Sequence, residues 1–456
     1  MNGIRGKRLA GIAMAGLTCL MVAGCASPGP KPARKPPEVV VPGVVASTPA
    51  APGSPGTAGS RGTSGSAGGP VVSARLRRYG PAGSHGVVRL GGWARGGADN
   101  PVAAGALAYF RWLNARGGVY GREVSYQVLD DHGDARIVPS LAHQLAQGAA
   151  VFAVFGPADP APDVAVARFL SSSQIPDVFT GSGCGCLNVP GQLPEVFSWP
   201  LEDVREGKIL GDYVAQRFRA GRVALLYAPD GPGRAELAAF QHTAKAKPAL
   251  REAVAGPVAI RAAVQAAGRA RPAVVVALAP AAVSAQIAAA MRARKLRVPL
   301  VAAGSGLAIG LPDGVITDGF LPSPGAPAGS AAGSWITLFR TIRKEYLPQA
   351  PFSAELVDGM AAAYNMAAAM FRAGPALTRQ NLVTALDGMP QGAAAGPLAY
   401  SLNDHSGVAG AYMGVVHDGF VVPAAGVMVT GPSLTQPVTP WSYQPQPAPP
   451  AGIPPL

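Results

Sequence analysis

The sequence predicts an α/β protein of two doubly wound lobes, each a parallel sheet with helices on both faces. Three observations predict this fold class. Short apolar stretches with strand character alternate with amphipathic stretches of helical period over about residues 85–430. The alternation runs through once and restarts near residue 200. A chain of 456 residues with 48% hydrophobic residues is also long enough to bury two cores.

The first round of alternation has clear helix boundaries. Asn100-Pro101 supplies an N-cap followed by a proline at the first helical position. Gly117-Gly118 ends the amphipathic segment that follows. The other expected elements of this round are strands at 86–91, 124–128, 151–155 and 177–180 and a helix near 162–172.

The second round repeats the pattern with apolar strands and amphipathic helices. Its expected strands are 222–228, 273–279 and 299–303, and its expected helices are 203–219, 234–246 and 281–295. Three late helices, near 331–346, 354–373 and 379–388, precede a hairpin-like ending at 397–423.

The amino terminus has the features of an export signal. Arg5, Lys7 and Arg8 precede Leu9–Gly24, an uncharged and mostly apolar run that is short for a transmembrane helix. Val22-Ala23-Gly24-Cys25 resembles a bacterial lipobox. This resemblance implies that Cys25 is lipidated and that the chain is anchored at the extracytoplasmic face of the cell membrane. The alternative is an ordinary secreted protein with a chance cysteine.

The composition divides the chain into segments. Residues 1–25 form the expected signal peptide and lipobox, and residues 26–83 are rich in Pro, Gly, Ser and Ala and predict a disordered tether. Residues 433–456 predict a disordered, Pro-rich tail. The expected lobes are 84–199 with 322–396, and 200–321 with 397–432.

The formal net charge of +13 raises the question of nucleic-acid binding. The basic residues are dispersed, and the denser groups at 75–78 and 292–297 are not interleaved with aromatic side chains that could stack on bases. The charge therefore indicates a solvated basic surface, and no nucleic-acid partner is expected.

Three stretches carry a likeness to a known family. They are 113–123 (LNARGGVYGRE) running into Asp130-Asp131, 151–157 (VFAVFGP), and 223–227 (VALLY) followed by Asp230 and Gly233. Together these stretches resemble the leucine/isoleucine/valine-binding proteins of branched-chain amino acid ABC importers, which are type I periplasmic binding proteins. The likeness covers about residues 85–430.

This resemblance implies two Rossmann-like lobes, joined by three crossings and hinged around a ligand cleft. It implies a substrate-binding subunit with a small-molecule solute and with ABC permease and ATPase partners, and it implies neither an enzyme nor a cofactor. The alternative is a ligand-sensing protein of the same fold that signals to a separate partner. A catalytic reading finds little support, since neither a Gly-x-Ser-x-Gly elbow nor a nucleophile beside a histidine occurs.

Ligands of doubly wound sheets bind outside the carboxyl ends of the strands, where loops and helix N-termini meet. The strand-end loops of this chain therefore give the candidate ligand-binding residues. They are Trp93, Asp159, Thr180 and Ser182 in the first lobe, and Asp230 and Ser305 in the second. Trp93 could stack on a ligand or only pack at the edge of its lobe.

The chain departs from the family pattern at the positions that hold an amino acid. Pro160 stands where a serine usually holds the ligand carboxylate, Pro232 where an aromatic residue is usual, and Ser305 where an acid usually grips the ammonium. The sequence therefore does not support leucine as the solute. Asp159 and Asp230 could favour a cationic or amine-bearing ligand, or could be solvated loop and cap carboxylates.

Two further motifs are weaker. Cys184 and Cys186 could form a disulfide, remain free thiols or, less readily, bind metal; no further ligands at suitable spacing accompany them, so no metal site is assigned. Asp230-Gly231-Pro232-Gly233 occupies the context of a dinucleotide-binding turn, but Glu236 stands in place of the third glycine. No nucleotide is therefore expected.

Overall fold

The computed structural model describes residues 86–158, 164–218, 221–245, 247–389, 394–442 and 445–455. The expected signal peptide with Cys25, the expected tether and the candidate residue Asp159 lie outside these residues. No described helix combines the length and the run of apolar residues that crossing a bilayer requires.

The first sheet is parallel throughout and has the order β2-β1-β3-β4-β5. In its register, Leu90 pairs with both Tyr126 and Ala153. The strands are β1 (Val87–Ala94), β2 (Glu123–Asp130), β3 (Ala153–Phe155), β4 (Asp177–Thr180) and β5 (Val196–Ser198). Because the strands are parallel, their carboxyl ends share one edge of the sheet.

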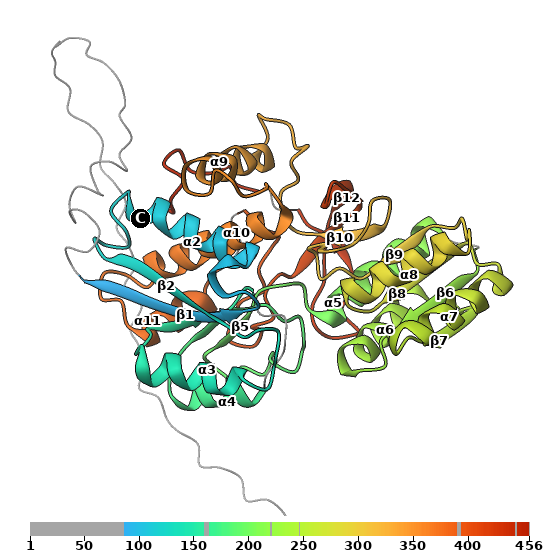
Figure 1. Cartoon of the computed structure of the whole chain (residues 1–456), viewed down its shortest axis with the longest axis horizontal. Coiled ribbons are helices and arrows are strands. Elements are labelled where there is room, and N and C mark those ends of the chain that lie inside the picture. The colour runs from blue at the N-terminus through green and yellow to red at the C-terminus, as the bar shows by residue number, and fades with distance from the viewer. Residues whose placement is uncertain are drawn as a thin grey trace, which may run out of the picture. The chain divides into compact units, whose positions relative to one another are not determined.

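Helices cover both faces of this sheet, and we call the whole assembly lobe one (Figure 1). One face packs against α2 (Pro101–Asn114) and α10 (Ala354–Arg372), and the other against α3 (Val138–His143) and α4 (Val164–Ser172). Gly359 lets α10 cross close to α2, because a Cβ there would lie 1.9 Å from the Val102 carbonyl oxygen. The helices α9 (Ala331–Tyr346) and α11 (Arg379–Asp387) complete this lobe.

The second sheet has the order β13-β12-β11-β10-β9-β8-β6-β7. Its strands from β7 to β10 are parallel, and β11 to β13 add to the β10 edge in antiparallel pairs. The strands are β6 (Val223–Tyr227), β7 (Leu250–Ala253), β8 (Val274–Leu278), β9 (Leu300–Ala302), β10 (Ile316–Gly319), β11 (Gly410–His417), β12 (Phe420–Val429) and β13 (Thr439–Pro440).

This sheet and its helices form lobe two. Alternate residues of its strands point to opposite faces, so that Leu225 packs toward α5 (Asp203–Arg217) and α6 (Gly231–Ala244). Leu226 packs toward α7 (Gly256–Ala270) and α8 (Ala281–Ala293). The two doubly wound lobes expected from the sequence are therefore confirmed.

The connection around residues 199–206 is tied to the late segment 404–408 by a buried cation. The Arg205 guanidinium, on α5, donates to Asp404 and to the hydroxyl of Ser406, and its side chain is almost fully buried. Leu201 also forms a β-bridge with Val408. Two passages of the chain between the lobes are therefore fixed to one another by charge and by backbone pairing.

The expected disorder of the Pro-rich tail is wrong for its described part. β13 pairs with β12, the indole N–H of Trp335 donates to the Gln446 carbonyl at 2.9 Å, and the Tyr109 hydroxyl donates to Gly452 at 3.2 Å. Ile453 is only 2% exposed. A proline-rich segment has few N–H donors but keeps its carbonyl acceptors, and the donors of α2 and α9 meet them.

We expect the substitution Ile453→Ala to lower the free energy of unfolding by about 2–4 kcal/mol, because it removes a buried aliphatic side chain and leaves a cavity. Leu434→Ala is the matched control in the same segment: Leu434 is exposed, and its loss should change stability by less than about 0.5 kcal/mol. Urea denaturation of both variants measures the difference. Equal effects would contradict the packed tail.

Candidate functional site

A cavity of about 690 Å³ is lined by loops at the carboxyl ends of strands from both sheets, and we call it the cleft. Lobe one contributes Pro157-Ala158 after β3 and Gly181–Cys184 after β4. Lobe two contributes Asp230 after β6, Pro280 after β8 and Ser305 after β9. The cleft therefore lies where doubly wound sheets bind ligands, and its volume is typical of a small-molecule site.

Several helices also begin at the cleft, but the chain itself caps most of them. Asn100 accepts hydrogen bonds from the first-turn amides of α2 at 3.0 and 3.4 Å. Asp230 accepts from the Gly233 amide of α6 at 2.8 Å, and Ser353 accepts from the first turn of α10 at 3.3 Å. Helix N-termini attract anions, and these three already hold acceptors of their own. α8, which follows Pro280, has no side-chain cap.

The cleft is lined by six carboxyl groups and, among its described lining, by no lysine, arginine or histidine. Two of the six belong to α10 of lobe one, and the other four belong to α5, to α6 and to the N-cap of α6 in lobe two. They are Asp203, Glu206, Asp230, Glu236, Glu355 and Asp358.

Glu206 is the most constrained of these acids. Its Oε1 accepts hydrogen bonds from the backbone amides of Gly304 and Ser305, both at 2.7 Å, and so holds the loop after β9. It also shares a hydrogen bond with Asp318, which lies on β10. Burial raises the pKa of Glu206 well above its usual range, and the negative charges of Asp318 and Glu236 raise it further.

Two lining acids carry buried oxygens without a hydrogen-bond partner among the described residues. Glu236 is 5% exposed and its Oε1 is unpartnered. Asp358 is fully buried; its Oδ1 accepts from the indole N–H of Trp199 at 2.7 Å, and its Oδ2 is unpartnered. Burial raises the pKa of Asp358 to about 7, and that of Asp203 also to about 7.

The nearest buried cations do not line the cleft. Arg205 pairs with Asp404, as described above, and the Lys208 ammonium donates to the carbonyls of Gly431 at 2.9 Å and Ser433 at 2.7 Å. Both cations lie on α5, the helix that also carries Asp203 and Glu206. The carboxyl groups of the cleft therefore lack the counter-charges that α5 could have supplied.

Of the residues predicted from the sequence, Ser182, Asp230 and Ser305 line the cleft. The Ser182 hydroxyl accepts from the Cys184 amide at 3.2 Å, and Asp230 acts as the cap of α6. Thr180 ends β4 beside Gly181, but it is not among the lining residues.

The prediction that Trp93 contacts a ligand is not supported by its position. Trp93 pairs with Leu129 across β1 and β2 and is 4% exposed. It belongs to the apolar cluster that α3 and α4 form against the first sheet, with Val138 and Leu170. The strand places this side chain on the face that those helices cover, which corresponds to the packing alternative.

Sequence reasoning missed Glu206, Glu236 and Asp358 as site residues. Acids in the first turn of a helix are common because they complement its dipole, so Glu206 gave no distinct signal. Asp358 did give one. It stands within α10, a helix buried on nearly every side, and a charged residue in such a helix needs a specific reason.

Cys184 and Cys186 form a disulfide, with Cα atoms 5.1 Å apart. Cys184 lines the cleft, and Gly185 between the two cysteines approaches a Glu202 carboxylate oxygen, which would lie 2.8 Å from a Cβ at this position. The disulfide therefore closes a tight loop at the wall of the cleft.

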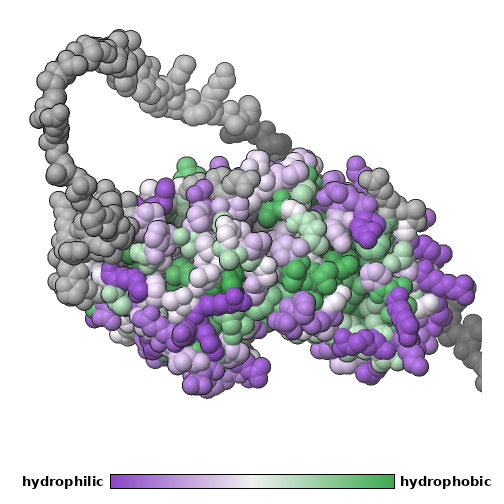
Figure 2. All heavy atoms as spheres, turned by 90° about the horizontal axis from the view of Figure 1, so that it is seen from above, coloured by the Kyte–Doolittle hydropathy of each residue, from purple (hydrophilic) through white to green (hydrophobic). Residues whose placement is uncertain are grey.

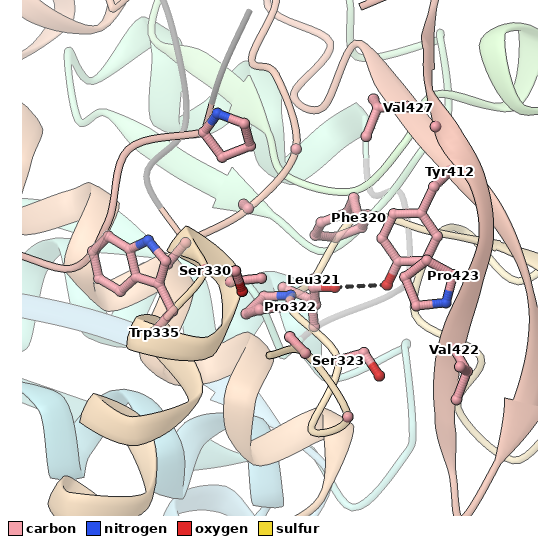
Figure 3. Close-up of a pocket in the computed structure, with 18 of the residues that line it drawn as sticks. Phe320, Leu321, Pro322, Ser323, Ser330, Trp335, Tyr412, Val422, Pro423 and Val427 are labelled. Carbon is pink, nitrogen blue, oxygen red and sulfur yellow. Dashed lines mark hydrogen bonds between the residues drawn. The ribbon is translucent and has the colours of Figure 1, made fainter. Parts of the chain in front are cut away.

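A second cavity of about 460 Å³ lies beside α9 and β12 (Figure 3). Phe320, Trp335 and Tyr412 line it, and the Tyr412 hydroxyl donates to the Leu321 carbonyl at 2.6 Å. The molecular surface seen from above carries apolar side chains near its middle (Figure 2). This cavity contains none of the predicted site residues and no charged group among its described lining.

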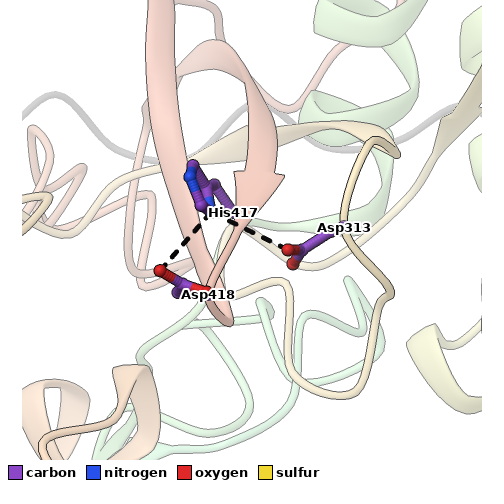
Figure 4. Close-up of side chains that lie close together, drawn as sticks. All are labelled: Asp313, His417 and Asp418. Carbon is purple, nitrogen blue, oxygen red and sulfur yellow. Dashed lines mark ion pairs between the residues drawn. The ribbon is translucent and has the colours of Figure 1, made fainter.

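Asp313, His417 and Asp418 gather near the turn between β11 and β12 (Figure 4). The His417 Nδ1 lies 3.7 Å from an Asp313 carboxylate oxygen and 3.5 Å from an Asp418 oxygen. All three side chains are exposed, and an exposed group of this kind does not by itself indicate a metal site.

A family model described as periplasmic binding protein matches residues 87–420. No curated protein matches the sequence. The fold is similar to that of a branched chain amino acid ABC transporter protein from Thermus thermophilus with bound valine, with a TM-score of 0.61 and 18% identity over 76% of this chain and 97% of that one.

Two further solved structures are similar. One is an ABC transporter substrate-binding protein from Desulfitobacterium hafniense in complex with Leu, with a TM-score of 0.58 and 16% identity over 74% of this chain and 99% of that one. The other is a solute binding protein of an ABC transporter from Rhodopseudomonas palustris BisB5 with 3,4-dihydroxy benzoic acid, with a TM-score of 0.58 and 17% identity over 74% of this chain and 96% of that one. At these identities the likeness shows the fold.

We expect Asp358→Asn to stabilise the protein at pH 8. Burial raises the pKa of the folded form to about 7 from an ordinary 3.8, so the folded state binds more protons than the unfolded state between these values. The stability of the parent chain therefore falls as the pH rises through this window, by an amount on the order of 2–4 kcal/mol, and the neutral amide avoids this loss.

Urea denaturation at pH 5 and pH 8 measures this difference. The gain from Asp358→Asn should be largest at pH 8, smaller at pH 5, and should vanish only as the pH falls to the ordinary value of 3.8. The control Asp313→Asn changes an exposed carboxylate and should show no such pH dependence. A variant that is less stable than the parent at pH 8 would show that Asp358 is charged and satisfied in the folded chain.

Proposed function

The chain belongs to the periplasmic binding protein family, and on this basis we propose that it is the lipid-anchored, solute-binding subunit of an ABC importer. The observation that carries the proposal is the cleft, whose walls come from strand-end loops of both lobes. The family consists of binding proteins with an extracytoplasmic location rather than enzymes. The solute would be a small polar metabolite captured between the lobes.

The positions of the lining residues suggest how capture works. Loops after β3 and β4 would contact the solute from lobe one, and loops after β6, β8 and β9 would contact it from lobe two. Closure of the lobes around the solute would then present a single surface to a permease. The Arg205 interactions with Asp404 and Ser406 tie two connections between the lobes and would limit such motion to a hinge.

The lipid anchor is proposed from Val22-Ala23-Gly24-Cys25 alone. Diacylglycerol on the Cys25 thiol would hold the chain at the membrane, and residues 26–83 would give the lobes reach above it. An anchored binding subunit stays near its permease without a transmembrane helix of its own.

We expect Cys25→Ser to remove membrane association when the full chain is produced in a bacterial host that processes lipoproteins. The parent should fractionate with membranes and accumulate as a heavier precursor when the lipoprotein signal peptidase is inhibited. Cys19→Ser is the matched control, because Cys19 lies in the segment expected to be removed. A Cys25→Ser chain that still fractionates with membranes would contradict the anchor.

We expect Ala282→Trp to abolish stabilisation of the protein by its solute, because a bulky side chain at this exposed position on the wall would fill the cleft. Ala293→Trp is the control: it makes the same change in the last turn of α8, outside the cleft. Thermal-shift measurements with a broad metabolite panel first identify a solute and then compare the two variants. Equal stabilisation of both variants would place binding elsewhere.

A further inference from the structure

We propose that the cleft selects a small organic cation with two or more separated positive charges carried by amines or guanidines. This inference rests on the proposed function and specifies the solute of the same site. The main observation is the set of six lining carboxyl groups without a basic residue among the described lining.

The acidity of the cleft is not a reflection of the whole chain. Lys and Arg number 38 against 25 for Asp and Glu, so a wall drawn at random from this sequence would be basic. The cleft reverses this balance with side chains from three helices in two lobes. Opposed carboxyl groups suit a ligand that has a positive charge at each end.

The unpartnered oxygens of Glu236 and Asp358 provide an independent indication of a ligand. Both side chains line the cleft, both are at least nine-tenths buried, and each leaves one oxygen without a hydrogen-bond partner among the described residues. A buried acceptor of this kind calls for a donor. One of these acids belongs to lobe two and the other to lobe one, so the donors of a single ligand could reach both.

A single metal ion fits these carboxyl groups poorly. Among the described residues, the three-member group with ligand atoms within 4.8 Å of one another is Asp313, His417 and Asp418, which does not line the cleft. Among the described residues, no three carboxyl groups of the cleft therefore lie close enough to hold one ion together. A cleft of about 690 Å³ also has room for an organic molecule.

The chemistry of the lining further restricts the cation. No aromatic side chain lines the cleft among the described residues, so the aromatic cage that recognises quaternary ammonium groups is missing. Carboxyl oxygens instead accept hydrogen bonds from N–H groups. The caps at Asn100 and Asp230 already occupy first-turn amides of α2 and α6, whereas α5 and α8 have no side-chain cap and begin beside lining carboxyl groups or apolar residues. Primary amines and guanidines therefore fit better than choline-like or anionic solutes.

The test is isothermal titration of the purified full chain with putrescine, spermidine, lysine, arginine, choline, leucine, glutamate and Ca²⁺. We expect saturable binding of at least one of the first four probes and at least tenfold weaker binding of the others. Glu236→Gln and Asp358→Asn should each weaken that binding about tenfold or more. Asp313→Asn, which changes an exposed carboxylate outside the cleft, should leave it unchanged.

The other outcomes distinguish the identity of the solute from the solute-binding function itself. Tightest binding of leucine, glutamate, choline or Ca²⁺ would overturn the polycation and, for the organic probes, leave the solute-binding function in place. Amine binding that is indifferent to both cleft variants would overturn the site. Urea denaturation of the Asp358→Asn variant at the pH of the titration shows whether it is folded, so that a loss of binding can be separated from unfolding. Binding of no probe by the folded parent would overturn the polycation, and the metabolite panel proposed above would then decide whether the solute-binding function stands.

Discussion

The helix α5 directs its basic side chains toward late segments of the chain and its acidic side chains toward the cleft. Its cations Arg205 and Lys208 are buried against the chain's own acceptors in the segments 404–406 and 431–433. Its acids Asp203 and Glu206 line the cleft. Arg205 therefore ties the two connections between the lobes, and Lys208 holds the loop between β12 and β13. Neither cation is among the described residues that line the cleft.

This separation has a thermodynamic consequence at the cleft. A buried carboxyl group without a counter-charge becomes protonated or destabilises the fold, and burial raises the pKa of Asp358 and of Asp203 to about 7. Such groups lower the free energy of unfolding, so they are not expected in a site whose residues contribute only to stability. A ligand that supplies positive charge and N–H donors would favour the ionised forms and so would stabilise the closed protein. The same carboxyl groups therefore favour the protonated form in the unliganded chain and the ionised form in the liganded chain.

The sequence predicted the architecture well and the site only in part. Apolar strands such as β6 and β8 are unambiguous in the sequence because both of their faces are covered. Asn100-Pro101 and Asp230 mark helix starts reliably, because Asn100 and Asp230 accept hydrogen bonds from first-turn amides. The helix α7 was not assigned, although Ile260, Val264 and Ala267 have helical spacing and give it a distinct apolar face. The packed tail was missed for a different reason, since composition does not show which donors elsewhere in the chain will meet a proline-rich segment.

The acids of the cleft show why a family pattern transfers poorly residue by residue. The sequence comparison expected an acid in the loop after β9 and found Ser305 there. In the structure, the backbone amides of Gly304 and Ser305 donate to Glu206, which comes from α5. A carboxyl group therefore reaches this part of the cleft from a helix rather than from the loop. Several elements enclose a site and together determine its acidic groups, whereas a sequence motif follows one segment of chain. An acid can therefore be present in the cleft although the motif of one loop is lost.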